Sequence, residues 1–322
     1  AKDTELHEFL AQQLEIESTP RDSWLVGKLW YLKGIDAVDN HNSQIHGVST
    51  VIYFSAPPMA QINYANALEE EGHFDETTRR AWEEAAVEWT AFGNRVFPDY
   101  KGGHFRLNDQ EEFEARAKAK DAELDKLLPA GTRDRLTAAK REKLSPDERR
   151  VLSIPPAKRT PEEGMAADSA TERLVIARPE LVREAPAEKR DAARRIAQEA
   201  QADADQAQSI SIFRTHVNFD YWQSRVLSEP TADAIDAHRL IYLAIEEQRK
   251  SSLADSTKKL FEDGFAKWRI IIDKYPKLFE DSSDDLYDSI RHYKKFLADR
   301  GEKLPANFSL HDIVEAHAKP GE

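Results

Sequence analysis

The sequence contains no cysteine, and that absence excludes several kinds of chemistry. Disulfide bridges, thiolate nucleophiles, cysteine-ligated zinc and cysteine-held iron–sulfur clusters all need this residue. Since disulfides indicate an oxidising compartment, their exclusion leaves exported and cytosolic locations equally open. The chain also lacks any apolar run near the roughly 20 residues of a membrane-spanning helix, so we expect it not to cross a bilayer.

Glycine and proline are scarce, with 12 and 15 residues among 322, while alanine, glutamate, arginine, lysine and leucine are abundant. This composition favours helix over a turn-rich β architecture. Basic residues are also fewer than acidic ones. The chain has 46 lysines and arginines and 59 aspartates and glutamates, which gives a net charge of −13. Nucleic-acid binding depends on basic side chains that neutralise phosphates, so we expect no nucleic-acid partner.

The motifs of several enzyme classes are missing. The chain has no Gly-Lys-Ser/Thr phosphate loop, no glycine-rich dinucleotide turn, no Gly-x-Ser-x-Gly elbow and no His-Glu-x-x-His helix. These absences exclude only the named classes. They favour a protein without enzymatic activity and without a cofactor.

Aromatic residues divide the chain into three parts. Four of the six tryptophans lie in the first hundred residues, the other two follow residue 220, and Phe113 is the only aromatic residue between Asp109 and Ser209. We predict an aromatic-rich helical region over 1–107, a charged helical middle over 108–209 and a C-terminal, repeat-like helical region over 210–322.

The charged middle carries helix-start signals. Asn108, Ser145 and Thr160 are each followed three residues later by glutamate. In this capping-box pattern the cap side chain and the glutamate each accept a hydrogen bond from a backbone N–H group that lacks an intrahelical partner. We therefore predict short helices that begin near each of these residues.

A long helix is predicted at the end of the middle region. From Pro186 to about Ser228 there is no further proline or glycine, and apolar residues recur at helical spacing. A single helix of this length would span roughly 60 Å. It would be either a coiled-coil surface or an arm folded back on the short helices of the same chain.

One window favours strand. Val48 to Ser55 is rich in β-branched and aromatic residues and is bounded by Gly47 and by Pro57-Pro58. This pattern predicts a short extended segment packed on helices.

Repeat-like spacings occur in three places. Trp24 and Tyr31, the segment 64–85, and the run from Gly264 to Pro276 carry small and aromatic residues at offsets typical of tetratricopeptide helix pairs. The predicted fold is all-α, with degenerate tetratricopeptide-like helical hairpins, a long charged helical arm and one short extended segment.

Several stretches spread over most of the chain carry a further likeness. They are Arg21–Lys28, Tyr53–Met59, Ala67–Gly72, Val217–Trp222 and Glu262–Arg269. These stretches resemble an uncharacterised family of bacterial helical proteins, some of which are labelled "iron responsive element". The resemblance implies that this chain is a C-terminal portion of a protein with a hydrophobic anchor further upstream. It therefore implies a membrane tether outside this chain and favours the bacterial cell envelope over the cytoplasm. It supplies no catalytic residues.

The candidate binding residues are Trp82, Trp89 and Phe92. At helical spacing such aromatic side chains either line a concave groove for a peptide or belong to the core. We take the groove as the candidate site for a protein partner, whose identity the sequence does not give.

The candidate metal site is Asp39, His41 and His46, which cluster in a polar segment between two aromatic ones. Two imidazoles and a carboxylate could bind a divalent ion, and the alternative is a solvated connection. His216 and Asp220 are a second pair, either an acid–base pair in a cleft or a buried histidine held by a carboxylate.

Two other clusters have simpler interpretations. His311, Glu315 and His317 resemble a metal site, but His317 lies about 240° around a helix from His311. We predict a C-terminal helix capped by Ser309 instead. The run Glu69–Glu71 is interpreted as a solvated helix end rather than a calcium loop.

These features predict a non-catalytic protein-binding or scaffold module. One alternative is a metal-dependent protein or enzyme that uses a His/Asp cluster. The other is a self-assembling structural subunit, since the sequence does not decide the oligomeric state.

Overall fold

The structure, a computed structural model, describes residues 20–40, 48–98, 103–250, 253–281 and 284–317. Helices dominate these ranges. The strands found in them, β1 (Phe97–Pro98) and β2 (His104–Phe105), form one short antiparallel pair. The predicted all-α class is therefore confirmed. None of the described helices combines the length and the apolar composition that a bilayer crossing requires.

The chain divides into two compact units. Unit 1 comprises residues 1–108 and 211–322, and unit 2 comprises residues 109–210. The first and third regions predicted from the sequence thus belong to one unit, which the charged middle interrupts.

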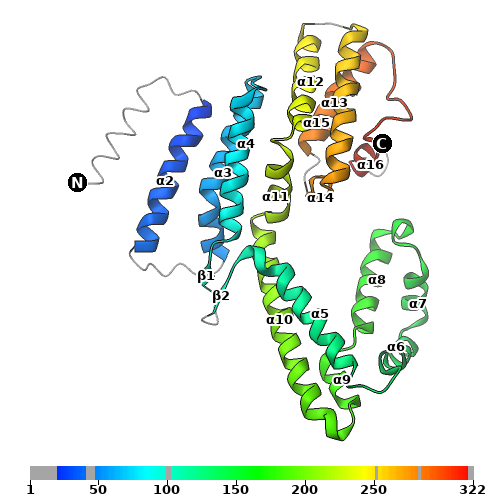
Figure 1. Cartoon of the computed structure of the whole chain (residues 1–322). Helices are drawn as coiled ribbons and strands as arrows, with labels where there is room; N and C mark the ends of the chain where they lie inside the picture. Colours follow the sequence, from blue (N-terminus) through cyan, green and yellow to red (C-terminus); the bar gives the residue numbers. More distant parts are fainter. Residues whose placement is uncertain (1–19, 41–47, 99–102, 251–252, 282–283, 318–322) are drawn as a thin grey trace. The chain divides into compact units, whose positions relative to one another are not determined.

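Unit 1 consists mainly of helices and also contains the β1–β2 pair (Figure 1). The helices are α2 (Pro20–Asn40), α3 (Val48–Glu70), α4 (Glu76–Gly93), α11 (Phe219–Ser228), α12 (Ala232–Arg249), α13 (Asp255–Lys274), α14 (Lys277–Asp281), α15 (Asp284–Asp299) and α16 (His311–Ala316). Unit 2 holds α5 (Gln110–Asp125), α6 (Thr132–Glu142), α7 (Pro146–Ser153), α8 (Pro161–Leu174) and α9 (Arg178–Glu184), and α10 (Arg190–His216) runs across the boundary.

The extended segment predicted at Val48–Ser55 is wrong, because these residues form the first turns of α3. α3 packs against both α2 and α4, and this packing buries Val51 and Phe54. Tertiary burial of a helix outweighs the weak β-propensity of such residues. Pro57 and Pro58 lie inside the helix, where they remove two intrahelical donors without ending it.

Two helical hairpins of unit 1 follow the predicted helix–turn–helix pairing. α3 and α4 are joined through Gly72, whose φ of 85° lies in the left-handed region that glycine adopts at low cost. α12 and α13 pack along each other and approach closely at Gly264. A Cβ atom at that position would lie 2.8 Å from Cγ1 of Ile241.

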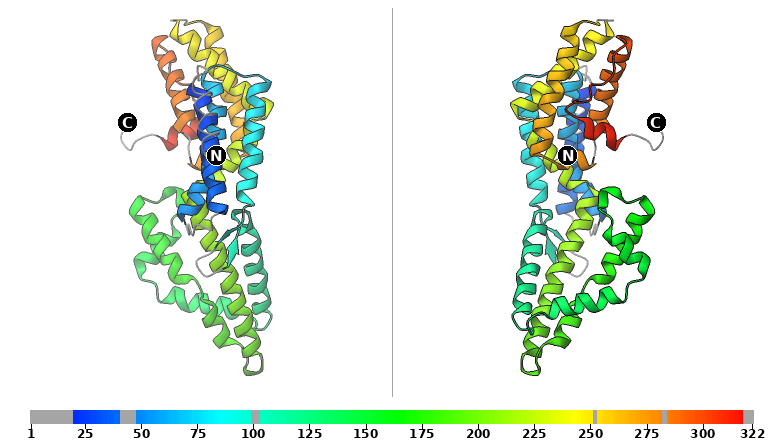
Figure 2. Two further views of the ribbon diagram at one scale, coloured as in Figure 1. Left: turned by 90° about the vertical axis from the view of Figure 1, so that its left-hand side faces the viewer. Right: turned by 90° about the vertical axis from the view of Figure 1, so that its right-hand side faces the viewer.

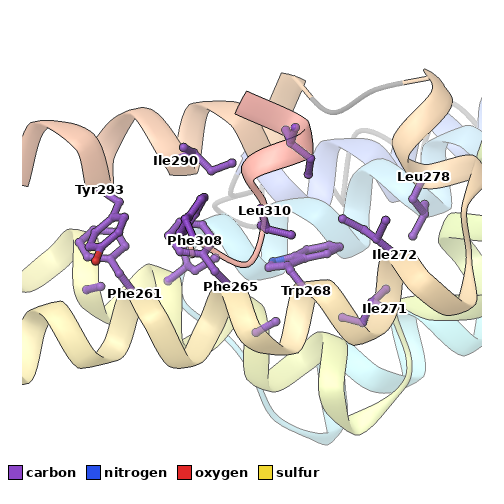
Figure 3. Close-up of a cluster of buried hydrophobic side chains, with 14 of the residues drawn as sticks. Phe261, Phe265, Trp268, Ile271, Ile272, Leu278, Ile290, Tyr293, Phe308 and Leu310 are labelled. Atoms are coloured by element: carbon purple, nitrogen blue, oxygen red, sulfur yellow. The ribbon is translucent and has the colours of Figure 1, made fainter. Parts of the chain in front are cut away.

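The main buried cluster of unit 1 lies along α13 (Figure 3). Phe261, Phe265 and Trp268 project from this helix toward Tyr293 of α15 and Phe308 ahead of α16. The ring centroids of Phe261 and Tyr293 are 5.2 Å apart, and those of Phe265 and Phe308 are 5.3 Å apart. These contacts hold α15 and the segment ahead of α16 against α13.

The predicted single long helix is wrong in one respect. It breaks at Asn218, whose φ of 48° separates α10 from α11. The break turns Phe219 into the core, where its ring stacks on Trp89 with a centroid distance of 5.6 Å. Asparagine tolerates the left-handed conformation better than most residues, so burial of the phenylalanine outweighs continuation of the helix.

Within unit 2, α10 is an arm folded back on helices of the same chain (Figure 1 and Figure 2). Ala193 and Ala197 of α10 pack against Leu181 of α9 and Leu124 of α5. The buried Asp203 of α10 pairs with Lys120 of α5 at 2.8 Å. The sequence left open a coiled-coil surface or an arm folded back on short helices. In unit 2, α10 packs as the folded-back arm.

Two of the three predicted capping boxes are confirmed. Ser145 and Thr160 accept hydrogen bonds from the backbone N–H groups of Glu148 and Glu163, and both glutamates reach back to the cap N–H. Asn108 does not cap a helix. It lies in a 3-10 turn ahead of α5, and its side-chain amide donates to Oδ1 of Asn94 at 2.9 Å.

Candidate functional site

Two carboxylates and an imidazole meet inside unit 1. Glu69 lies at the C-terminal end of α3, Glu229 follows α11, and His238 lies in the second turn of α12. The three donor atoms that these side chains offer lie within 4.8 Å of one another. Glu69 is 7% exposed and Glu229 is 1% exposed, so the two carboxylates are held away from bulk water. We call Glu69, Glu229 and His238 the acidic–imidazole cluster.

The inner oxygen of each carboxylate faces the same ring nitrogen. Nε2 of His238 lies 2.9 Å from Oε2 of Glu229 and 3.6 Å from Oε2 of Glu69. The imidazole packs edge-on against the indole of Trp268, with a centroid distance of 4.9 Å, and this contact restrains the ring. Three segments of unit 1 therefore bring two carboxylate oxygens and one imidazole nitrogen to the same place.

The outer oxygens are held by neighbouring donors. Nε1 of Trp82 donates to Oε1 of Glu69 at 2.8 Å, and Nε of Arg225 donates to Oε1 of Glu229 at 3.2 Å. The Arg225 guanidinium also donates to the hydroxyl of Tyr221 and to Oδ1 of Asn66. These contacts fix the orientation of both carboxylates.

The cluster shifts the pKa of each member. Burial raises the pKa of Glu69 to about 7, although the charge of His238 opposes the shift. Burial also acts to raise the pKa of Glu229, but the charges and hydrogen bonds of His238 and Arg225 outweigh it and hold that pKa below its usual range. Burial acts to lower the pKa of His238, yet the two carboxylates raise it to about 9.

A cavity of about 310 Å³ adjoins the cluster. Its polar lining comprises Glu69, Glu229 and His238 together with Asn66, Glu70, Arg225 and Ser289. The remaining wall is mostly apolar and comes largely from α12 and α13, including Ile241, Tyr242, Ile245, Trp268 and Ile272. The cavity therefore combines a mostly hydrophobic wall with a few charged and polar side chains.

The structure places the predicted aromatic site residues in the core. Trp82 and Trp89 are 0% exposed, and Phe92 is 4% exposed. Trp89 and Phe92 pack against Phe219, while Trp82 serves as a hydrogen-bond donor to Glu69. They do not line a groove, and the predicted groove is corrected to the core interpretation.

The predicted metal site is not assembled by the described residues. Asp39 lies in α2, where both of its carboxylate oxygens accept from Nη2 of Arg95 at 2.6 and 2.7 Å. His41 and His46 lie outside the described residues.

The other two histidine clusters are also separated. Asp220 accepts from the Arg214 guanidinium, while Nδ1 of His216 lies 2.7 Å from a carbonyl oxygen of its own helix, so no acid–base pair forms. His311 and Glu315 approach only to 3.9 Å at the surface. His317 instead stacks on Tyr287, and the predicted cap Ser309 makes no side-chain capping bond to α16.

Sequence reasoning missed the acidic–imidazole cluster. Glu69 was assigned to a solvated helix end, but only its neighbours Glu70 and Glu71 are exposed. Glu229 and His238 carry no motif. The available signal was weak: a tryptophan 13 residues after Glu69 supplies a buried donor for it.

Comparison of the chain with protein-family models, with curated proteins and with solved structures gives no match.

Proposed function

We propose that this chain is a non-catalytic binding module whose cavity receives an apolar or aromatic side chain of a protein partner. The observation that carries the proposal is the lining of the cavity. Its wall is built mostly from aliphatic and aromatic side chains, together with a smaller set of charged and polar ones. Binding sites typically combine an apolar wall with a few fixed polar groups in this way.

The helical hairpins support a binding role by analogy. α3–α4 and α12–α13 are paired helices, and glycines occur at the turn of the first and the crossing of the second. Degenerate tetratricopeptide-like hairpins of this kind bury their apolar faces by stacking and present concave surfaces to partners. This support comes from fold analogy rather than from the chemistry of the site.

The charge of the chain favours one class of partner. A net charge of −13 accelerates association with basic proteins and slows it with acidic ones. We therefore propose a partner segment that is apolar at its centre and neutral or basic around it.

α12 offers a matched pair of positions for a test. Ile245 lines the cavity and is half-buried, whereas Leu243, two residues earlier, is 40% exposed and does not line it. A carboxylate introduced at residue 245 would stand in the apolar wall, and one at residue 243 would stand in solvent.

The experiment selects peptides from a random display library on the full-length chain. The best peptides are then titrated by calorimetry into wild type, Ile245→Glu and Leu243→Glu, with circular dichroism as a check of folding. We expect the peptides to share an aliphatic or aromatic residue. They should bind Ile245→Glu at least about 10-fold more weakly, because desolvating a carboxylate in an apolar wall is unfavourable, and bind Leu243→Glu as they bind wild type. Peptides that bind all three proteins equally would refute the proposal.

A further inference from the structure

We propose that the acidic–imidazole cluster binds one divalent transition-metal ion, held by Glu69, Glu229 and His238, with an open coordination position toward the cavity. This inference does not rest on the proposed binding of a partner side chain. It follows from the donor atoms, their spacing and the groups that hold them.

The donor set suits such an ion. Imidazole nitrogen and carboxylate oxygen are ordinary ligands of Zn²⁺, and metal sites with three protein ligands leave a further position for water or substrate. Two carboxylates also bring a charge of −2 to the site when ionised, which a divalent cation neutralises. In the metal-free protein Arg225 and the protonated His238 offset this charge, and a bound ion would take the place of the imidazole proton.

The spacing fits a metal centre. Two ligand atoms bound to a tetrahedral Zn²⁺ at about 2.1 Å lie about 3.4 Å apart. The distances from Nε2 of His238 to the two inner carboxylate oxygens, 2.9 and 3.6 Å, bracket this value. The carboxylate oxygens of Glu69 and Glu229 lie within 4.8 Å of each other, so side-chain rotations would have to set their separation for all three atoms to reach coordination distance.

Neighbouring side chains form hydrogen bonds that orient the proposed metal ligands. Trp82 and Arg225 bind the outer oxygens of Glu69 and Glu229, so that the inner oxygens converge on His238. Hydrogen bonds of this kind fix the orientation of metal-ligating carboxylates, and their loss typically weakens metal binding 10- to 100-fold.

The cavity supplies the open position. All three ligands line it, so a bound ion would face a space of about 310 Å³ rather than packed side chains. Water or a donor group of a ligand has room to complete the coordination.

The test is calorimetric titration of Zn²⁺ into the full-length chain after treatment with a chelator. The variants are Glu69→Gln, His238→Asn and the double substitution His311→Asn with Glu315→Gln, which removes a His–Glu pair from the surface. We expect wild type and the surface double variant to bind one equivalent with equal affinity. Glu69→Gln and His238→Asn should bind at least about 10-fold more weakly, since each loses a direct ligand.

A second measurement needs no substitution. Anomalous diffraction from crystals of wild type soaked in Zn²⁺ should place an ion between the three side chains. An ion located elsewhere, no saturable binding by wild type, or equal affinity of wild type and His238→Asn would overturn the proposal. Peptide titration in the presence of a chelator separates the two proposals, because the binding of a partner side chain needs no bound ion and Zn²⁺ binding needs no peptide.

Discussion

The indole Nε1 of Trp82 donates a hydrogen bond to a carboxylate oxygen of Glu69, 2.8 Å away, and both side chains are buried. Replacing Trp82 with phenylalanine keeps most of the ring and removes this donor. We expect the substitution to lower the free energy of unfolding by about 1 to 3 kcal/mol, because the buried carboxylate oxygen of Glu69 loses its hydrogen-bond donor. Urea denaturation followed by circular dichroism measures the loss.

Trp89 provides the matched control for that prediction. Its Nε1 donates to the carbonyl oxygen of Phe219 over a longer distance, 3.3 Å, and the acceptor is neutral. Trp89→Phe should therefore cost less than Trp82→Phe, on the order of 1 kcal/mol. Equal losses for the two variants would show that the carboxylate acceptor has no special importance.

A second prediction concerns the turn between α3 and α4. Gly72 has a φ of 85°, and a Cβ atom there would lie 2.7 Å from the ring of Tyr242. Gly72→Ala should destabilise the protein by about 2 to 4 kcal/mol, because left-handed backbone strain adds to a steric clash. Gly301 has a φ of 73° in open space, so Gly301→Ala should cost only about 1 to 2 kcal/mol. Thermal denaturation that ranks the two variants in the opposite order would contradict this account.

The capping boxes of unit 2 give a third prediction. Ser145→Ala and Thr160→Ala each remove an oxygen that accepts a helix N–H group, and each should lower the free energy of unfolding by about 1 kcal/mol. Ser153, at the other end of α7, bonds only to a carbonyl oxygen of its own helix at the surface. Ser153→Ala should change stability by less than about 0.5 kcal/mol in the same urea titration.

A fourth prediction concerns pH in the metal-free protein. The pKa of Glu69 is raised from 4.5 to about 7, so the folded state holds this proton more tightly than the unfolded chain does. Its contribution to stability is complete below pH 4.5 and is lost as the pH rises through 7. The pKa of His238 is raised from 6.5 to about 9, so its contribution is present below pH 6.5 and is lost as the pH rises through 9.

Glu69→Gln removes the first of these contributions, because glutamine has no proton to lose, and it also reduces the second, because the charge of Glu69 helps to raise the pKa of His238. We expect wild type to lose more stability than Glu69→Gln when the pH is raised from 5 to 8 in the presence of a chelator. Urea midpoints at the two pH values measure the difference. A parallel decline of both proteins would mean that Glu69 has an ordinary pKa.

Local features of this fold could be predicted from the sequence, and features that depend on distant contacts could not. The caps at Ser145 and Thr160 were predictable because each involves residues three positions apart. The break at Asn218 was not, because it depends on the burial of Phe219 against a tryptophan 130 residues away. The helix at Val48–Ser55 has the same explanation, since packing with α2 and α4 overrides its local propensity.

The candidate site shows the same limit. Glu69 lies 160 positions before Glu229, and neither residue belongs to a recognisable motif. Only the fold brings them to His238. A glutamate in an acidic run is usually solvated, and nothing local distinguishes the buried member of the run from its exposed neighbours.

The interruption of unit 1 by unit 2 has a consequence for biosynthesis. Trp89 leaves the ribosome 130 residues before Phe219, the ring on which it stacks. At about 5 to 20 residues per second, this interval lasts between about 6 and 26 seconds. Throughout it, α4 exists without the Phe219 ring, and the ribosome synthesises the whole of unit 2 before it reaches Phe219. For that interval Trp89 can pack on Phe92 of its own helix, and its stack on Phe219 forms only after unit 2 has been synthesised.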